Sequence, residues 1–310
     1  MDIIGKKYFY FALSLLIVVP GLISLILYGL NLSIDFTGGT RLTLLFPHKV
    51  EKQTISKIRD AILQQKISVS SIETSSRLTF VRTSPMDQNQ NTKFLNSLSR
   101  EFKGVKQTEF ETIGPTIGKE TTANAIKAVV LASILIVLYI TWSFRKIPKP
   151  ASSWRFGICA IVALIHDVLV VVGIFSLLGH FFKVEIDSLF VVALLTIIGF
   201  SVHDTIVVFD RIRENLKRIS AVPFATVVND SILQTLARSL NTSITTLLVL
   251  FALYIFGGES TKWFIVALLI GITSGTYSSI FNAAPLLVVW EEWSNKKKFR
   301  FARDAKASST

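Results

Sequence analysis

Long hydrophobic stretches separated by short polar connections dominate the pattern of this chain of 310 residues. Six of them are long enough to cross ~30 Å of hydrocarbon as helices. The first exceeds the ~7–15-residue core of a signal peptide and is followed by no small-residue cleavage site, so we expect a retained anchor. The pattern predicts an α-helical polytopic membrane protein with six transmembrane helices, at Tyr8–Tyr28, Ala123–Phe144, Trp154–Leu178, Ser188–Phe209, Ile232–Phe256 and Trp263–Trp290.

A different pattern fills residues 31–122, between the first two hydrophobic stretches. Short apolar segments alternate there with two stretches of helical spacing, which gives the order βαββαβ of a split, ferredoxin-like sheet. Because ~90 residues bury only one modest core, we expect one small α+β domain that contacts something outside the membrane. Its strands are predicted at Arg41–Phe46, Val69–Thr74, Arg77–Thr83 and Lys106–Ile113, and its helices at Val50–Lys66 and Thr92–Phe102.

The expected domains follow from these two patterns. Residues 1–30 form a stub with the first helix, and residues 31–122 form the α+β domain. Residues 123–290 form a five-helix membrane bundle, and residues 291–310 form a basic tail.

Basic residues mark alternate connections, and by the positive-inside rule these connections face the cytoplasm. The other two short connections hold only Lys183 and Lys262. We therefore expect both termini in the cytoplasm and the α+β domain on the outer side. The marking residues are Lys6, Lys7, Arg145, Lys146, Lys149, Arg155, Arg211, Arg213, Lys217, Arg218, Lys296, Lys297, Lys298, Arg300, Arg303 and Lys306.

Composition supports a membrane protein, since half of the residues are hydrophobic and the mean hydropathy is +0.53. The net charge of +12 is explained by the topology signal and by attraction to anionic lipid head groups. A basic tail is also typical of nucleic-acid binding, but six preceding spans favour the lipid bilayer as its partner. The single cysteine, Cys159, lies in a span, so no disulfide holds the outer domain.

Two acids inside spans, Asp167 and Asp204, carry the chemistry of the sequence. An ionised carboxylate in hydrocarbon is retained where it is paired, lines a wet cavity or titrates. Arg238, in the fifth span, is the candidate partner of Asp204, because both lie ~8–9 Å from the cytoplasmic ends of their spans. Asp167 lies deeper, ~20 Å from that end, and a functional and a structural role are both open for it. His166 is interpreted as a packed histidine.

Further polar and small residues accompany these acids. Arg238, Thr242 and Thr245 recur at i, i+4 and i+7, which predicts one polar stripe on the fifth helix. The stripe suits a hydrated path or a contact between helices, although each threonine hydroxyl can also bond back to its own helix. In the sixth span, Gly271 and Gly275 leave a smooth face for close packing, against a partner subunit or, as we favour, within the bundle.

Glycine-containing motifs stand at both ends of the outer domain. One contains Asp35, Gly38 and Gly39, and the glycine pair permits backbone conformations that other residues resist. The other contains Gly114 and Pro115, which break the chain direction. A hinge and a simple turn are both open for each motif.

The chain carries these motifs in one order: IDFTGGT, TIGPTIGKE, the His-Asp pair of the third span, LLTIIGFSVHDTIVVFDRIREN, SLNTSITTLLVL and IGITSGTYSSIFNAAPLL. From about Asn31 to Leu287 the set resembles the SecD/SecF family of bacterial protein-export membrane subunits, and within it the smaller, SecF-type members. The resemblance implies one half of a resistance-nodulation-division-type assembly in the bacterial inner membrane, completed by a SecD half.

Function and partners also follow from the resemblance. It implies that the outer domain contacts preproteins emerging from the SecYEG channel, with a YidC-type insertase as a possible further partner, and that a proton gradient assists translocation. Asp204 and Arg238 match the intramembrane acid and base that the family requires. His203 stands where many relatives carry Asn, so its part in a proton path is open.

Other function classes fit less well. A proton-driven exporter of small molecules or lipids shares the fold logic, but it is normally a twelve-span chain with two outer domains. A purely structural subunit needs no buried acid and base. No GxSxG, phosphate-binding loop or HExxH is present, so we expect no enzyme, metal or cofactor.

Overall fold

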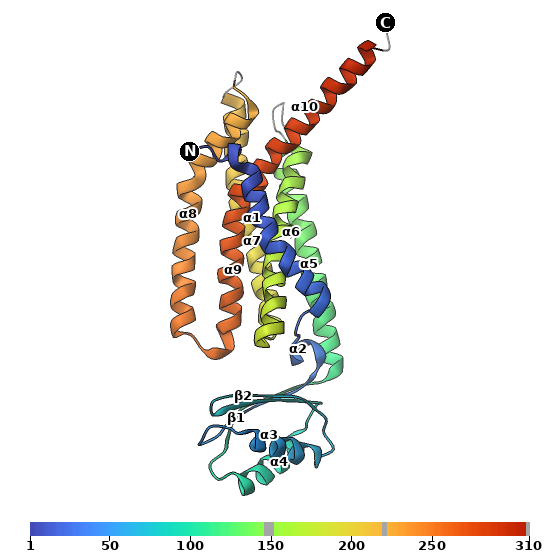
Figure 1. Cartoon of the computed structure of the whole chain (residues 1–310), viewed down its shortest axis with the longest axis vertical. Coiled ribbons are helices and arrows are strands. Elements are labelled where there is room, and N and C mark those ends of the chain that lie inside the picture. Colours follow the sequence, from blue (N-terminus) through green and yellow to red (C-terminus); the bar gives the residue numbers. More distant parts are fainter. Residues whose placement is uncertain (146–151, 219–221, 308–310) are drawn as a thin grey trace. The chain divides into compact units, whose positions relative to one another are not determined.

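The computed structural model describes residues 1–145, 152–218 and 222–307. The chain divides into two units (Figure 1). The helix unit comprises Met1–Asn31, Ala128–Val184 and the chain from Leu189 onward. The sheet unit comprises Leu32–Lys127 and the short connection Glu185–Ser188. This connection lies far along the chain from the predicted domain at residues 31–122.

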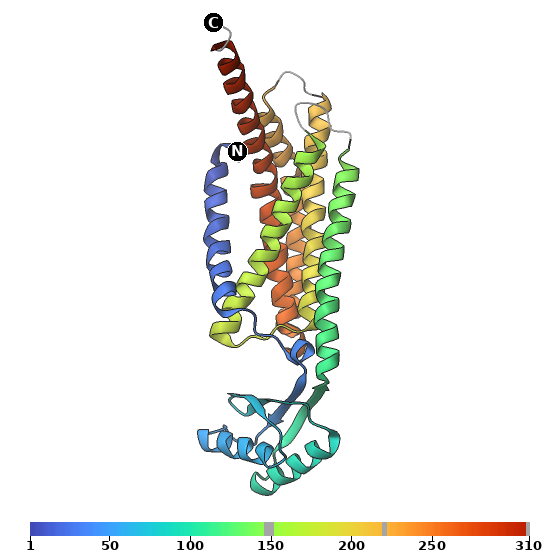
Figure 2. The ribbon, with the colours of Figure 1, turned by 90° about the vertical axis from the view of Figure 1, so that its right-hand side faces the viewer.

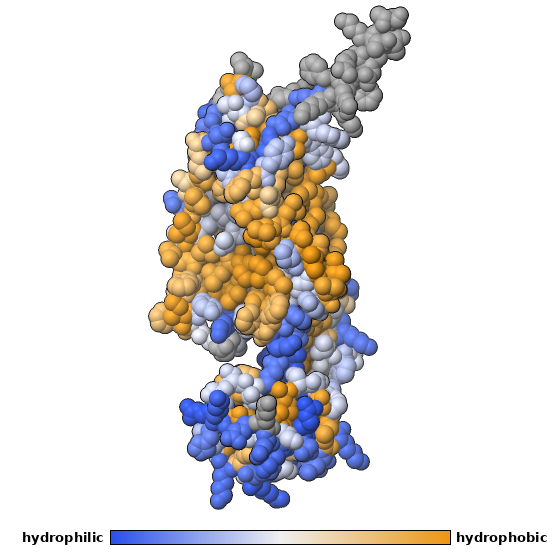
Figure 3. Space-filling model, in the orientation of Figure 1, coloured by the Kyte–Doolittle hydropathy of each residue, from blue (hydrophilic) through white to orange (hydrophobic). Residues whose placement is uncertain are grey.

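The helix unit contains the predicted membrane spans. Among the described residues, 6 helices are long and apolar enough to cross a membrane, as the sequence predicts. On the face shown in Figure 3, hydrophobic residues cover most of the helical region, while the strand region is largely hydrophilic. The spans are built from α1 (Lys7–Tyr28), α5 (Pro115–Ser143), α6 (Ser153–Phe182), α7 (Ser188–Arg218), α8 (Phe224–Phe256), α9 (Lys262–Ser278) and α10 (Ala284–Ala307).

Most of these helices extend beyond the predicted hydrophobic stretches, because polar residues at their ends continue the same backbone hydrogen bonding. The helical part of the tail, to Ala307, belongs to α10. Lys146 and Lys149, which contributed to the predicted orientation, lie outside the described residues.

Small residues set a close helix contact between α1 and α6. A Cβ added to Gly21 would lie 2.8 Å from the Cα of Gly173, so the two backbones touch. One turn further on, the hydroxyls of Ser24 and Ser176 lie 2.9 Å apart. Close approach of small residues replaces the hydrophobic effect as the packing force in lipid.

The sheet unit has the predicted βαββαβ order, with β1 (Gly39–Leu45), α3 (Lys52–Leu63), β2 (Val69–Ser75), β3 (Leu78–Thr83), α4 (Gln88–Glu101) and β4 (Lys106–Ile113). The sheet is antiparallel, with the strand order β2-β3-β1-β4. Helices α3 and α4 lie together on one face of it (Figure 2), over a core that includes Leu42, Val81 and Phe94. The prediction of a ferredoxin-like domain is confirmed.

The two glycine motifs meet in one joint within the sheet unit. A short helix, α2 (Ile34–Thr37), leads into Gly38 and Gly39, whose φ angles are 71° and 130°. A Cβ on Gly38 would lie 2.8 Å from the Cα of Pro115, the first residue of α5. The segment entering β1 is therefore seated directly against the segment leaving β4. Gly114, by contrast, has open space where a Cβ would be.

We expect Gly39→Ala to destabilise the sheet unit, because the new Cβ would lie 2.7 Å from the Thr83 carbonyl oxygen at a φ that alanine disfavours. The expected loss is about 1–3 kcal/mol. Limited proteolysis of the purified full chain measures it. Gly114→Ala is the matched control and should be tolerated. Equal protease resistance of both variants would show that the close approach of Gly39 to Thr83 does not stabilise the sheet unit.

Candidate intramembrane site

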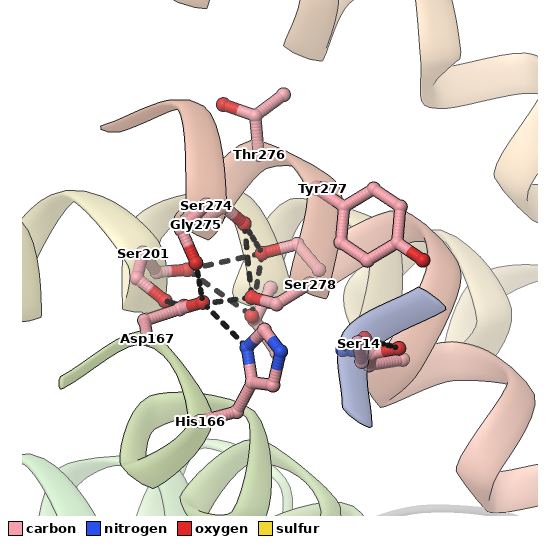
Figure 4. A network of polar contacts seen from close by, with 12 residues as sticks. Ser14, His166, Asp167, Ser201, Ser274, Gly275, Thr276, Tyr277 and Ser278 are labelled. Carbon is pink, nitrogen blue, oxygen red and sulfur yellow. Dashed lines mark hydrogen bonds and ion pairs between the residues drawn. The ribbon is translucent and has the colours of Figure 1, made fainter. Parts of the chain in front are cut away.

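Asp167, on α6, is completely buried, with an exposed fraction of 0%. Three serine hydroxyls donate hydrogen bonds to its carboxylate (Figure 4): Ser201 of α7 at 2.5 Å, Ser274 of α9 at 2.8 Å and Ser278 of α9 at 2.6 Å. A buried carboxyl group needs hydrogen-bond partners, and the three hydroxyls supply them. The carboxylate thereby joins α6, α7 and α9.

His166 adds a fourth partner to this carboxylate. Its Nδ1 lies 3.0 Å from Asp167 Oδ1, on the other carboxylate oxygen from Ser201 and Ser278. His166, interpreted as a packed histidine, thus also contacts the neighbouring acid. Adjacent positions on a helix diverge by ~100°, but the imidazole is long enough to turn back toward its neighbour. We call Asp167, His166, Ser201, Ser274 and Ser278 the serine cradle.

Asp204, on α7, is also buried, with an exposed fraction of 2%. Its surroundings differ from those of Asp167. The hydroxyl of Thr276 on α9 lies 3.4 Å from Asp204 Oδ2, and Ser243 of α8 in turn lies 2.6 Å from Thr276. Longer and fewer hydrogen bonds compensate a buried charge less well. Asp204 thus has fewer and longer hydrogen bonds than Asp167.

The predicted pairing of Asp204 with Arg238 is not formed. No ion pair joins them in the part of the chain that the structure describes. Arg238 is exposed on α8 and lines a cavity of about 570 Å³ together with Asp210, Arg211 and Glu214 of α7. Similar depth fixes the position of a residue along a helix but not the direction in which its side chain points.

The other predicted polar residues lie on exposed faces. Thr242 donates to the Arg238 carbonyl oxygen at 3.0 Å, and Thr245 donates to the Asn241 carbonyl oxygen at 2.9 Å. Both hydroxyls thus bond back to their own helix, which was the second of the two expected arrangements. His203 is exposed on α7 beside Asp204. The row of Arg238, Thr242 and Thr245 leaves a polar stripe on the outside of α8.

Gly271 and Gly275 bring α9 against α7. A Cβ on Gly275 would lie 3.0 Å from the Ser201 Cβ, and one on Gly271 would collide with Ile197. This close approach is what lets Ser274 and Ser278 reach Asp167. A π-helical segment, Ser279–Ala283, follows directly, and such segments are frequent at functional sites.

Sequence reasoning missed the serine cradle. Ser274 and Ser278 are four residues apart and so share a helix face. This spacing was visible in the sequence, but the sequence does not indicate which acid the two serines contact. In the described ranges, no three His, Cys, Asp or Glu side chains are grouped in a way that could hold a metal ion. The site is therefore one of buried acids and hydroxyls.

Comparison with known proteins identifies the family. Residues 93–293 match the model of the protein export membrane protein SecD/SecF, C-terminal, and residues 23–46 match that of the SecD/SecF GG motif. The chain belongs to the SecD/SecF family. The GG motif corresponds to the joint at Gly38 and Gly39, and the larger match spans α5 to α10 together with α4 and β4.

Relatives of the SecF type match the whole chain. The protein translocase subunit SecF of Thermobaculum terrenum is 48% identical over 98% of this chain and 97% of its own length. That of Anaerolinea thermophila is 42% identical over 100% of this chain and 99% of its own length. Both alignments thus cover nearly the whole of each of the two chains compared.

Two solved SecDF structures share the fold. The crystal structure of SecDF from Thermus thermophilus, described as a translocon-associated membrane protein, is 36% identical, with a TM-score of 0.81. The match covers 94% of this chain and 39% of SecDF. SecDF in a super-membrane-facing form matches at a TM-score of 0.68 and 35% identity, covering 98% of this chain and 40% of the other. This chain thus corresponds to less than half of a SecDF protein.

Proposed function

We propose that this chain works as a SecF subunit of the bacterial Sec machinery and uses a proton gradient, with SecD, to assist preprotein translocation through SecYEG. The observation that carries the proposal is Asp204, a buried acid that contacts the hydroxyl of Thr276 and forms no ion pair within the described residues. A buried carboxylate without a cationic partner is unfavourable as a charge, and taking up a proton neutralises it. The family membership supplies the transport context.

Two different roles for the two acids follow from their contacts. The charge of Asp167 is compensated by three short hydroxyl contacts and an imidazole, so we assign it to holding α6, α7 and α9 together. Asp204 has weaker contacts, so we assign the proton-coupling role to it. Arg238 lines the cavity beside α7 and, in this proposal, responds to the Asp204 charge by rearranging rather than by standing paired with it.

SecD is the proposed partner half, because the SecDF relatives combine a SecF-like portion with additional chain. Large apolar side chains are exposed along α1, α5 and α8, which leaves surface for the lipid bilayer and for this partner. The further proposed partners are the SecYEG translocon, a YidC-type insertase and translocating preproteins.

Reconstitution tests the proposed function. Vesicles containing SecYEG, SecD and this chain should translocate a preprotein faster when a proton gradient is imposed, and an uncoupler should remove the increase. Vesicles without this chain are the control. An increase that is the same with and without the chain would refute the proposal.

The proposed orientation, with both termini in the cytoplasm of a bacterial inner membrane, predicts a labelling pattern. In a Cys159→Ser background, Ser70→Cys on β2 should react with an impermeant thiol reagent on intact cells, because residue 70 is exposed in the sheet unit. Lys217→Cys, equally exposed at the end of α7, should react only after lysis. The reverse pattern would invert the topology.

A further inference from the structure

Helix α7, which carries Asp204, begins inside the sheet unit. Its first residue, Ser188, belongs to the connection Glu185–Ser188 that groups with the sheet. The Ser188 backbone N–H donates a hydrogen bond to Asp35 Oδ2 at 2.8 Å. The first N–H groups of a helix have no partner within it, and a carboxylate there also complements the helix dipole. Asp35 therefore caps the helix of the proton-coupling acid.

Three further contacts hold the same connection. Leu32 and Ile186 form a parallel β-bridge, and the Ser33 N–H donates to the Ile186 carbonyl oxygen at 2.8 Å. Arg82 of β3 forms an ion pair with Glu185. Burial lowers the pKa of the Arg82 guanidinium, and the negative charge of Glu73 counteracts this desolvation. We call the set Leu32, Ser33, Asp35, Arg82 and residues 185–188 the α7 clamp.

The clamp is backed by a rigid support. Asp35 lies in α2, and the next residues are Gly38 and Gly39 with their positive φ angles. On the far side, Gly118 of α5 approaches the Gly38 nitrogen so closely that a Cβ there would lie 2.8 Å from it. Thr122 donates to the Phe36 carbonyl oxygen at 3.3 Å. The segment carrying Asp35 is thus fixed to both β1 and the start of α5.

Helix α7 can transmit a displacement between the clamp and the acid. It runs unbroken for 31 residues, from Ser188 to Arg218, and contains no proline. Asp204 lies 16 positions after Ser188, or ~24 Å along the axis. Kinks occur mainly at proline and at helix irregularities, so a shift or rotation at Asp204 is carried to the N-terminus of the helix.

We propose that Asp35 is a positioning residue that couples α7 to the sheet unit. Because α7 carries Asp204, this contact couples the protonation of Asp204 to the sheet unit. The Arg82–Glu185 ion pair provides a second such contact. The proposal rests on the proposed function for the role of Asp204. The carboxylate of Asp35 and the ion pair make α7 and the sheet unit move together, so that a change of charge in the membrane becomes a displacement outside it.

Amide hydrogen exchange of the full chain in lipid tests the coupling directly. Four proteins are compared: the wild type, Asp204→Asn as the neutral form, Asp35→Ala, and the double variant. We expect Asp204→Asn to change exchange at residues 32–40 about tenfold, the effect of one charge-assisted hydrogen bond. That response should vanish in the Asp35→Ala background. The same response with and without Asp35 would overturn the proposal.

Matched variants separate coupling from folding. Asp87 also caps a helix in the sheet unit, by accepting from the Gln90 N–H at 2.7 Å, but it caps α4. Asp87→Ala should leave the response of residues 32–40 to Asp204→Asn intact, and Asp35→Asn, which keeps an acceptor oxygen, should retain most of it. Arg82→Glu should weaken the response and Glu185→Arg should restore it in the double swap. If the double swap did not restore the response, the Arg82–Glu185 ion pair would have no part in the coupling.

Translocation assays tell this inference apart from the proposed function. If both hold, Asp35→Ala loses gradient-stimulated translocation while proton uptake at Asp204 persists. If the wild type shows no gradient stimulation, the proposed function fails, yet the exchange experiment still decides whether Asp35 links Asp204 to the sheet unit. Loss of proton uptake in Asp35→Ala would place Asp35 in the proton path and contradict its role as a positioning residue.

Discussion

Asp204→Asn is expected to abolish gradient-stimulated translocation while leaving membrane insertion and assembly intact. The amide keeps the shape of the neutral acid and can still meet the Thr276 hydroxyl, but it cannot alternate between charged and neutral forms. One charge crossing the full membrane field gains ~2.3 kcal/mol per 100 mV, or a factor of ~50 in an equilibrium constant, and this sets the scale of the stimulation per proton that the variant can lose. Translocation into vesicles with an imposed gradient measures it.

Asp210→Asn is the matched control on the same helix. Asp210 lines the same cavity as Arg238, but it is exposed and lies 2.6 Å from Arg213 in an ion pair. Exposed pairs contribute little, so this variant should translocate normally if the coupling requires the buried acid. Arg238→Met should resemble Asp204→Asn, and the double variant should be little worse than either, as expected of residues that act as a unit. Additive losses would mean that Arg238 acts independently of Asp204.

Asp167→Ala is expected to cause the largest loss of stability. It removes the common acceptor of three serine hydroxyls on two other helices. Partial compensation follows because serines in helices can bond back to their own carbonyl oxygens. The expected net loss in the free energy of unfolding is about 3 kcal/mol, measured by denaturant unfolding in detergent.

Two comparisons make this prediction specific. Asp167→Asn, which keeps one acceptor oxygen, should lose less stability than Asp167→Ala. Ser239→Ala, on α8, removes a buried hydroxyl that has no hydrogen-bond partner among the described residues, and it should be nearly neutral. If Asp167→Ala unfolded with its midpoint at the same denaturant concentration as the wild type, the serine cradle would not hold the helices together.

The elements of the fold were predictable because each is encoded locally. A stretch of apolar residues long enough to span hydrocarbon has few alternatives to a helix, and alternation at period two with turns between specified the four strands of the sheet. The small connection Glu185–Ser188 was not predictable, because its place in the sheet unit depends on the long-range contacts of Asp35 and Arg82.

The geometry of the site was only partly predictable. Position along a span gave the depths of Asp167, Asp204 and Arg238, yet not their partners, which depend on how each helix is rotated and packed. That rotation is set by close approaches such as Gly275 against Ser201, and their partners cannot be recognised from one helix alone. The glycine motifs signalled unusual backbone, while their contact with each other emerged only in three dimensions.

In the proposed function, Asp204 is the acid that takes up and releases a proton. Infrared difference spectroscopy of the full chain in lipid, between acid and alkaline pH, tests it most directly. We expect a carboxylic-acid band that titrates in the wild type and in Asp167→Asn and is absent in Asp204→Asn. A titrating band that survives in Asp204→Asn and disappears in Asp167→Asn would contradict this assignment and show that Asp167 is the acid that takes up the proton.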